Sequence, residues 1–170
     1  EKDHEWGIFD YSQQEPRLVV HYANKNGFPG AGKFLDSYQK DNNTDFHTMV
    51  SEIADIPRKQ AKTINLGLFY GMGKGKLMSE LGVNIEEATE LLQSYHERVP
   101  FVKKLTYDTQ GIASKNGFLT TIQGRRCRFD LWESELEWGK KALPEEEAER
   151  EYGKKTIKRA WTYKALNKLI

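Results

Sequence analysis

Apolar residues recur three and four positions apart over most of this chain, the spacing of helices with one buried face. The clearest case is residues 46–53, where the apolar positions are Phe46, Met49, Val50 and Ile53. Segments rich in glycine, asparagine and proline, such as 24–32, separate the helical ones. The pattern predicts a first helix between a cap at Ser12 or Gln13 and the loop that begins at residue 24. Further helices are predicted over residues 33–43, 46–53, 57–71, 76–81, 85–99, 101–115 and 156–170.

Capping residues mark several of these helix boundaries. Asp55 is a candidate cap for the helix that Pro57 opens, because proline is favoured at the first helical position. Asn84 is predicted to cap a later helix, and Ser12 or Gln13 to cap the first one. Boundary residues and apolar spacing therefore agree on a mainly helical chain.

Only a few short segments favour strands. Residues 5–10 are predicted as a strand with Asp10 at its end, and residues 118–129 as a hairpin around Gln123-Gly124. The segment 132–150 is acidic and poor in aliphatic residues, and we expect it to be a surface excursion. The predicted fold class is α+β, mainly α.

The composition is that of a polar protein with no membrane-spanning segment. Of 170 residues, 38% are hydrophobic and 30% are charged, and the mean hydropathy is −0.75. No run approaches the roughly 20 apolar residues that a spanning helix needs, and the N-terminus does not resemble a signal peptide. The single cysteine, Cys127, excludes an internal disulfide and fits a reducing compartment, so a cytoplasmic location is predicted.

Charge is distributed unevenly along the chain. Residues 57–128 contain 12 Lys/Arg and 6 Asp/Glu, whereas the rest contains 14 and 19. A basic centre between acidic flanks suits a polyanionic partner such as DNA or a nucleoside triphosphate. A merely solvated surface is the alternative that charge alone leaves open.

The helix predicted over 57–71 carries a stripe suited to a nucleotide. Arg58, Lys62, Leu66 and Tyr70 lie four residues apart, so they form one slanted edge about 18 Å long. That length matches an extended nucleoside triphosphate, and the cations lie at the end where the helix dipole favours anions. We expect phosphates at the Arg58 end and the base at the Tyr70 end. The alternative is an ordinary amphipathic helix with solvated basic residues.

Two glycines near this stripe indicate that another group approaches the helix backbone closely. Gly67 and Gly71 are predicted to lie inside the helix, where each costs about 0.5–1 kcal/mol relative to alanine. This indicates close approach of another group to the backbone. The glycine-rich run 71–76 lacks the P-loop spacing and follows a helix rather than a strand, so it is not a phosphate-binding loop.

The junction after the first predicted strand is a candidate metal site. Asp10 ends the strand, and its carboxylate together with the carbonyl of Tyr11 offers hard oxygen ligands for Mg²⁺. An aspartate at a strand end is more commonly a cap, so this residue alone is weak evidence.

Four segments together resemble the motifs of family A DNA polymerases, the group that includes bacterial DNA polymerase I and many phage replicative enzymes. Residues 10–17, DYSQQEPR, look like motif A, and residues 45–48, DFHT, are similar to the D-x-H-T element. Residues 58–71, RKQAKTINLGLFYG, resemble motif B, and residues 117–126, which end in Gly-Arg-Arg, resemble the family's hairpin. The four occur in family order and at family spacing, which makes the resemblance highly specific.

This resemblance implies how a deoxynucleoside triphosphate is held. His47, Arg58 and Lys62 grip the triphosphate, and Lys62 is also the best candidate for a general acid to the pyrophosphate leaving group. Tyr70 packs beside the nascent base pair and leaves that position as the fingers open. Glu15, bonded to Tyr70, closes off the space that a ribose 2′-hydroxyl needs.

The resemblance also implies two Mg²⁺ ions and primer–template DNA as partners. Asp10 is one of two carboxylates that hold the metals, with the Tyr11 carbonyl as a further ligand. Gln13, Arg125 and Arg126 contact template or primer DNA. The second carboxylate is expected in motif C, a His-Asp-Glu segment beyond the last residue, in the same chain or a separate one.

Several positions depart from the family pattern. Leu66 replaces the Phe or Tyr that usually precedes the motif B glycine, at a position facing the sugar. Gln14 and Pro16 replace the usual apolar pair of motif A, and Cys127 stands where a third arginine is common. The acidic stretch after residue 132 looks like an insertion.

The resemblance implies a partial palm with motif A over 1–44, fingers with motif B over 45–117, and a return to the palm over 118–170. That last part contains the hairpin, the acidic insertion and a closing helix. The expected function is template-directed 5′–3′ DNA synthesis as part of a larger or split polymerase, and the 170 residues alone are predicted to be inactive. A non-catalytic nucleic-acid-binding module and a relative of single-subunit RNA polymerases are the alternatives. The second is less favoured, because Glu15 beside Tyr70 argues for deoxynucleotides.

Overall fold

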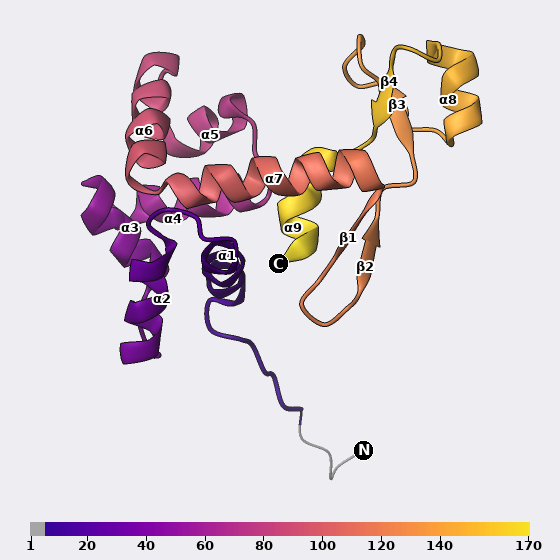
Figure 1. Ribbon diagram of the computed structural model, residues 1–170. Coiled ribbons are helices and arrows are strands. Elements are labelled where there is room, and N and C mark those ends of the chain that lie inside the picture. The colour runs from indigo at the N-terminus through magenta and orange to yellow at the C-terminus, as the bar shows by residue number, and fades with distance from the viewer. Residues whose placement is uncertain (1–5) are drawn as a thin grey trace.

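A computed structural model describes residues 6–170, and helices form most of it (Figure 1). In chain order they are α1 (Gln14–Lys25), α2 (Ala31–Lys40), α3 (Phe46–Ala54), α4 (Arg58–Phe69), α5 (Lys74–Leu81), α6 (Ile85–Arg98), α7 (Pro100–Asn116), α8 (Glu145–Tyr152) and α9 (Ala165–Leu169). A short 3₁₀ helix, η1 (Thr162–Lys164), precedes α9. The mainly α form of an α+β fold is confirmed. Among residues 6–170, no helix is both long and apolar enough to cross a membrane.

The strands form two small antiparallel pairs. In one pair β1 (Phe118–Thr120) lies beside β2 (Arg126–Arg128), and in the other β3 (Trp132–Ser134) lies beside β4 (Ile157–Arg159). The predicted hairpin is confirmed, although its paired strands are shorter than the pattern indicated. Gly124 has a φ of +83°, a conformation that glycine adopts readily at such a turn.

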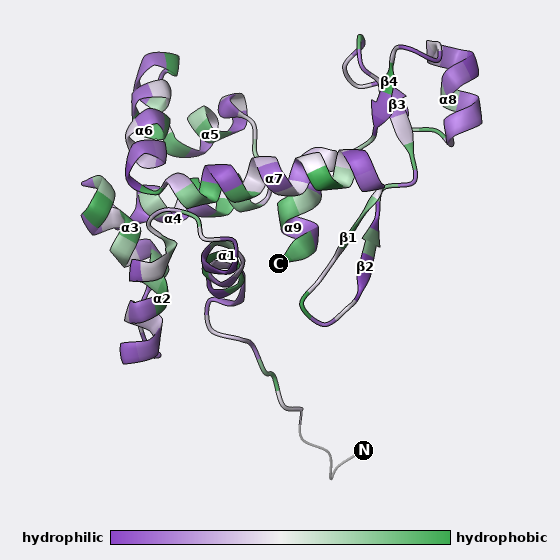
Figure 2. Cartoon of the chain, viewed as in Figure 1, coloured by the Kyte–Doolittle hydropathy of each residue, from purple (hydrophilic) through white to green (hydrophobic). Residues whose placement is uncertain are grey.

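Helix α7 runs through the middle of the molecule and contacts α1, α4, α6 and α9 (Figure 1). The β3–β4 pair and α8 lie at the opposite end from α2 and α3. Helix α8 is hydrophilic over most of its surface, as Figure 2 shows. The acidic segment is therefore a surface element, as predicted, but it contains a strand and a helix of its own.

A cluster of buried aromatic rings joins the four helices around the predicted nucleotide site. The ring centroids of Phe34 (α2) and Phe46 (α3) lie 5.1 Å apart, and Phe101 (α7) lies 5.1 Å from Phe34. Phe69 (α4) lies 6.0 Å from Phe46. These four side chains are at most 2% exposed. Because His47 follows Phe46 and Tyr70 follows Phe69 directly, this core fixes where the predicted site residues emerge.

Two predicted elements are wrong. Residues 6–10 are not a strand: they pair with no described strand, and the side chains of Trp6, Ile8 and Phe9 are at least 95% exposed. Residue 5, the other member of that prediction, lies outside the described residues. The segment 156–170 is not one helix, because it divides into β4, η1 and α9. Trp161, with a φ of +57°, separates β4 from η1.

Two details of the motif B helix also differ from prediction. Asp55 does not cap α4: it ends α3 in a left-handed conformation with a φ of +53°, and Pro57 occupies the N-cap position. Gly71 lies outside α4, which ends at Phe69. Gly67 does lie inside, and a Cβ there would come within 3.2 Å of the Met72 sulfur. The close approach inferred at Gly67 is thus made by a side chain of the protein itself.

Replacing Gly71 with alanine is expected to destabilise the fold by about 1–2 kcal/mol or more. Its φ is +69°, and a Cβ would lie 2.5 Å from the backbone oxygen of Tyr163. Gly73→Ala is the matched control, because nothing lies within 4 Å of a Cβ there. Urea denaturation of both variants checks this, and equal stabilities would contradict it.

Candidate active site

The predicted stripe is an exposed edge of α4. Arg58, Lys62 and Tyr70 are exposed and Leu66 is half-buried. The other faces of α4 supply the core, through Ala61, Ile64, Asn65, Gly67 and Phe69. Tyr70 follows the last helical residue with a φ of −90° and a ψ of 5°, so it continues the edge. The arrangement has the exposure that binding along this edge requires.

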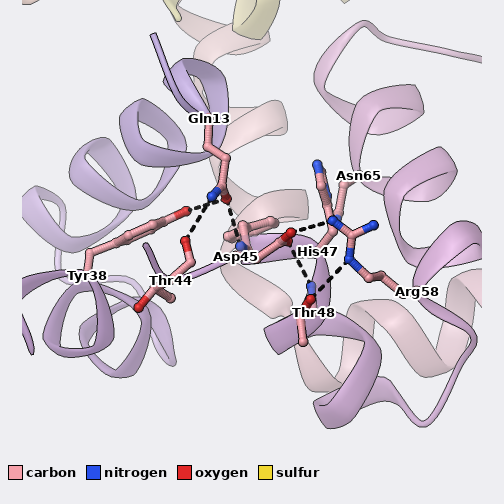
Figure 3. Close-up of polar contacts among 9 residues, drawn as sticks. Gln13, Tyr38, Thr44, Asp45, His47, Thr48, Arg58 and Asn65 are labelled. Carbon is pink, nitrogen blue, oxygen red and sulfur yellow. Dashed lines mark hydrogen bonds and ion pairs between the residues drawn. The ribbon is translucent and has the colours of Figure 1, made fainter. Parts of the chain in front are cut away.

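The first cation of the edge is oriented by α3. The guanidinium of Arg58 forms an ion pair with Asp45, and its Nε donates to Thr48 Oγ1 at 3.1 Å (Figure 3). Asp45 also caps α3, because its carboxylate accepts from the Thr48 amide at 3.0 Å. Burial alone would raise the pKa of Asp45, but these hydrogen bonds and the charge of Arg58 outweigh it and lower the pKa. The carboxylate therefore stays ionised and holds Arg58 in place.

His47 lies behind the edge and is only 7% exposed. Its Nδ1 lies 2.9 Å from Nδ2 of Asn65, a residue of α4 (Figure 3). Burial lowers the pKa of His47. The nearby carboxylate of Asp45 opposes this effect, while Arg58 and Lys62 add to it. The ring is therefore neutral near pH 7, and it offers a hydrogen bond to a ligand rather than a full charge.

We expect the fold to lose stability as the pH falls below about 6.5. Burial lowers the pKa of both His47 and His96 from 6.5, so on acidification the unfolded chain takes up protons before the folded chain does. The contribution of the two neutral histidines to the free energy of unfolding is fully present above pH 6.5. It is lost as the pH falls toward the pKa values that these histidines have in the folded chain. Urea titrations at about pH 7.5 and about pH 5.5 test this. A His47→Gln, His96→Gln variant should show a smaller difference between the two, and a wild-type stability unchanged between them would contradict the prediction.

Helix α1 brings Glu15 to the far end of the edge. The Tyr70 hydroxyl donates to Glu15 Oε1 at 3.0 Å, which confirms the predicted bond between these residues. This hydrogen bond is the main cause that raises the pKa of Tyr70, and burial is the second. The pair joins residues 55 positions apart in sequence, so it ties the start of α1 to the end of α4.

Gln13 ties the start of α1 to α3. Its amide donates to the Thr44 carbonyl at 2.9 Å and accepts from the Phe46 amide at 2.8 Å (Figure 3). The Tyr38 hydroxyl lies 3.4 Å from the side-chain oxygen of Gln13, Oε1. Neither Gln13 nor Ser12 caps α1 through its side chain: Gln13 occupies the cap position with a φ of +55° and makes no such bond. A contact of Gln13 with DNA stays a prediction.

A groove of about 840 Å³ connects the motif A junction with the hairpin. Tyr11, Arg17 and Arg125 line it, so the predicted metal junction and one predicted DNA-binding arginine share one surface. Arg126 is exposed beside it in β2, with its guanidinium 4.6 Å from the centre of the Phe118 ring. The groove offers positive charge and an aromatic face, the features that bind a nucleic-acid strand.

Comparisons with known proteins decide the family. The sequence profile described as DNA polymerase family A matches residues 1–167. This chain belongs to DNA polymerase family A.

Two family A relatives show how much of such a protein the chain represents. It is 33% identical to a DNA-directed DNA polymerase of Pseudomonas phage M6 over 211 aligned positions, which cover 100% of this chain and 28% of that protein. It is 33% identical to DNA polymerase I of Bacillus caldotenax over 125 positions, 72% of this chain and 14% of that protein. The chain therefore spans less than a third of either relative.

A solved polymerase domain has a similar fold. It is described as the POL domain of Pol1 from M. smegmatis in complex with DNA primer-template and dNTP. The TM-score is 0.65 at 25% identity, over 93% of this chain and 25% of that one.

The family A chain supplies only part of a donor set for Mg²⁺. Asp10 and Tyr11 are exposed and precede α1, and their carboxylate and carbonyl oxygens have the hard character that Mg²⁺ prefers. Within residues 6–170, no group of three or more His, Cys, Asp or Glu side chains is gathered to hold a metal. Because Mg²⁺ keeps several water or phosphate ligands, one carboxylate and one carbonyl fit as part of a site.

Sequence reasoning missed two residues of this site, Asn65 and Tyr95. Both are fully buried, and the Tyr95 hydroxyl donates to Asn65 Oδ1 at 2.6 Å. The available signal was a polar side chain on the apolar face of the motif B helix. Cys127, which stands where a third arginine is common, lies with its sulfur 3.1 Å from the Lys168 carbonyl.

Proposed function

We propose that the protein containing this chain adds deoxynucleotides to a primer 3′-hydroxyl under the direction of a template. One observation carries the proposal: the exposed edge of Arg58, Lys62, Leu66 and Tyr70, with His47 behind it and Glu15 at its end, lies in a family A chain. This edge has cations for phosphates at one end and an aromatic side chain for a base at the other. The solved relative is a complex with DNA primer-template and dNTP, so these are the proposed partners here as well.

The residues of the edge have distinct proposed roles. Arg58, held by Asp45, and Lys62 neutralise the charge of the β and γ phosphates, and His47 donates a hydrogen bond to them. Lys62 gives a proton to the departing pyrophosphate. The side chains act mainly by positioning and by electrostatic stabilisation, as in other phosphoryl transfers.

Residues outside this edge have proposed roles toward the metal ions and DNA. Asp10 and the carbonyl of Tyr11 are proposed to hold Mg²⁺ together with a carboxylate from motif C. Two such ions stabilise charge on the attacking and leaving oxygens when bound. Arg125 and Arg126 are proposed to hold template or primer phosphates, and Gln13 to contact DNA from the start of α1.

Primer extension tests the proposal. The chain is assayed alone, mixed with a polypeptide that carries the His-Asp-Glu segment, and as part of a polymerase of the relatives' length. Extension is expected only where motif C is present. Extension by the chain alone would contradict the predicted inactivity of the 170 residues. DNA binding without extension in every sample would favour a non-catalytic nucleic-acid-binding module instead.

A further inference from the structure

A buried series of polar side chains joins three helices behind the α4 edge. Tyr95 of α6 donates its hydroxyl hydrogen to Asn65 Oδ1 at 2.6 Å, and Asn65 Nδ2 lies 2.9 Å from Nδ1 of His47 on α3. Tyr95 and Asn65 are 0% exposed and His47 is 7% exposed. Buried polar groups are strongly destabilising without hydrogen-bond partners. Each donor in this series must therefore face an acceptor.

The phenol fixes the direction of the series. Burial strongly raises the pKa of Tyr95, so its hydroxyl keeps its hydrogen and needs an acceptor. Asn65 Oδ1 is that acceptor, which turns the amide nitrogen toward His47. An amide nitrogen can only donate, so Nδ1 of His47 must present a lone pair. With the amide reversed, the tyrosine hydrogen would face another donor and lose its acceptor.

We propose that Asn65 is a positioning residue: anchored by Tyr95, its amide holds His47 as a neutral imidazole with the hydrogen on Nε2. The ring then has one N–H group, on the side away from Asn65, for a ligand oxygen. On the proposed function, that oxygen belongs to the phosphates of a deoxynucleoside triphosphate. Only the identity of this ligand rests on the proposed function.

The charged surroundings of His47 make this arrangement consequential. Burial favours the neutral ring most, the carboxylate of Asp45 opposes this, and Arg58 and Lys62 on α4 add to it. A donor at Nδ1 favours the neutral ring as well, and it selects which nitrogen carries the hydrogen. The phosphates then meet two full positive charges, on Arg58 and Lys62, and one neutral donor.

Nitrogen-15 NMR of the histidine rings in the 170-residue chain tests the proposal without any ligand. We expect an unprotonated Nδ1 and a protonated Nε2 for His47 near pH 7.5 (about one unit above the ordinary histidine pKa). A protonated Nδ1 in the wild-type chain would overturn the proposal. His21, which is half-buried on α1, serves as the internal reference.

Asn65→Asp reverses the polarity of the contact while keeping the shape of the side chain. The carboxylate can still accept from Tyr95, but it now accepts from His47 as well. We expect Nδ1 to become protonated and the midpoint of the His47 titration to rise by about 1 pH unit or more. Asn116→Asp, an exposed change at the far end of α7, should leave both readouts as in wild type (Figure 1). An unchanged His47 in Asn65→Asp would contradict a positioning role.

Tyr95→Phe provides a second variant that adds no charge. Without the phenol, the Asn65 amide can turn either way, so both tautomers of His47 should be populated. Tyr107→Phe, a change at a tyrosine that is 62% exposed, is the matched control. A single Nε2–H tautomer in Tyr95→Phe would show that the anchor is not needed and would reject that part of the proposal.

Adding a deoxynucleoside triphosphate separates the two proposals. A change in the His47 Nε2–H signal supports both the nucleotide contact of His47 and its positioning by Asn65. The same change should be smaller in Asn65→Asp. An unchanged signal, with the wild-type tautomer as expected, counts against the proposed nucleotide contact of His47 and leaves the positioning by Asn65 supported.

Discussion

Replacing Lys62 with alanine in a complete polymerase that carries this chain is expected to lower kcat for nucleotide addition by about 10²- to 10⁴-fold. Lys62 is exposed on the α4 edge, one helical turn beyond Arg58, so its ammonium can reach the same polyphosphate. In its proposed role, Lys62 supplies both a charge that stabilises the departing pyrophosphate and a proton that this group accepts, and the change removes both. Single-turnover kinetics with primer–template DNA and a dNTP measure the effect, because they separate binding from chemistry.

Two further variants give this prediction its control. Lys59→Ala removes another exposed cation of α4, one that is not among the four edge residues, so its rate should stay close to wild type. Lys62→Arg keeps the charge but cannot give up a proton near neutral pH. If Lys62 acts as a proton donor, the arginine variant stays slow; if only its charge matters, the arginine variant recovers. A Lys59→Ala loss equal to that of Lys62→Ala would show that the position on the edge is unimportant.

The helices were predictable from sequence because their signals are local. Apolar spacing and boundary residues lie within a few positions of each other, and the Asn84–Glu87 capping box at the start of α6 illustrates this directly. Gly117 likewise ends α7 in the left-handed conformation, with a φ of +75°. Such features need no knowledge of the rest of the fold.

The wrong elements depend on partners that the local pattern does not contain. Residues 6–10 have the side chains of a strand, but a strand is stable only beside another, and no described residue pairs with them. In the segment 156–170, residues 157–159 pair with β3, which lies much earlier in the chain. Their pairing with β3 competes with helix formation, and the positive φ of Trp161 then redirects the chain.

The residues of the α4 edge were predictable from the sequence, and the buried contacts of Asn65 behind it were not. Arg58, Lys62, Leu66 and Tyr70 share one helical edge, so helical geometry alone aligns them. The resemblance to the family added Glu15 and His47. No local pattern indicates that Asn65 meets both Tyr95 and His47, because those contacts join residues 30 and 18 positions apart.

The aromatic core explains why separate helices can present one site. Phe46 and Phe69 pack together, with centroids 6.0 Å apart, and the next residue along the chain from each is a predicted site residue. The Arg58–Asp45 ion pair and the Asn65–His47 contact join the same two helices. Helices α3 and α4 are therefore held together at three points, and we expect them to move as a unit if the fingers open.

Replacing Glu15 with alanine in the complete polymerase is expected to weaken discrimination against ribonucleotides by roughly 5- to 150-fold, the equivalent of about 1–3 kcal/mol of steric exclusion. The Tyr70 hydroxyl holds the Glu15 carboxylate at 3.0 Å, so the side chain fills a fixed position beside the edge. If Glu15 has its proposed role, removing the side chain opens space for a 2′-hydroxyl. The ratio of kcat/KM for a dNTP and the matching rNTP measures the effect. Glu15→Gln keeps the size of the side chain and can still accept a hydrogen bond from Tyr70, so it should retain the discrimination. Tyr70→Phe should lose part of the discrimination, because the Glu15 carboxylate is no longer held. If Glu15→Ala leaves the ratio unchanged, sugar selection lies elsewhere and the proposed role of Glu15 is wrong.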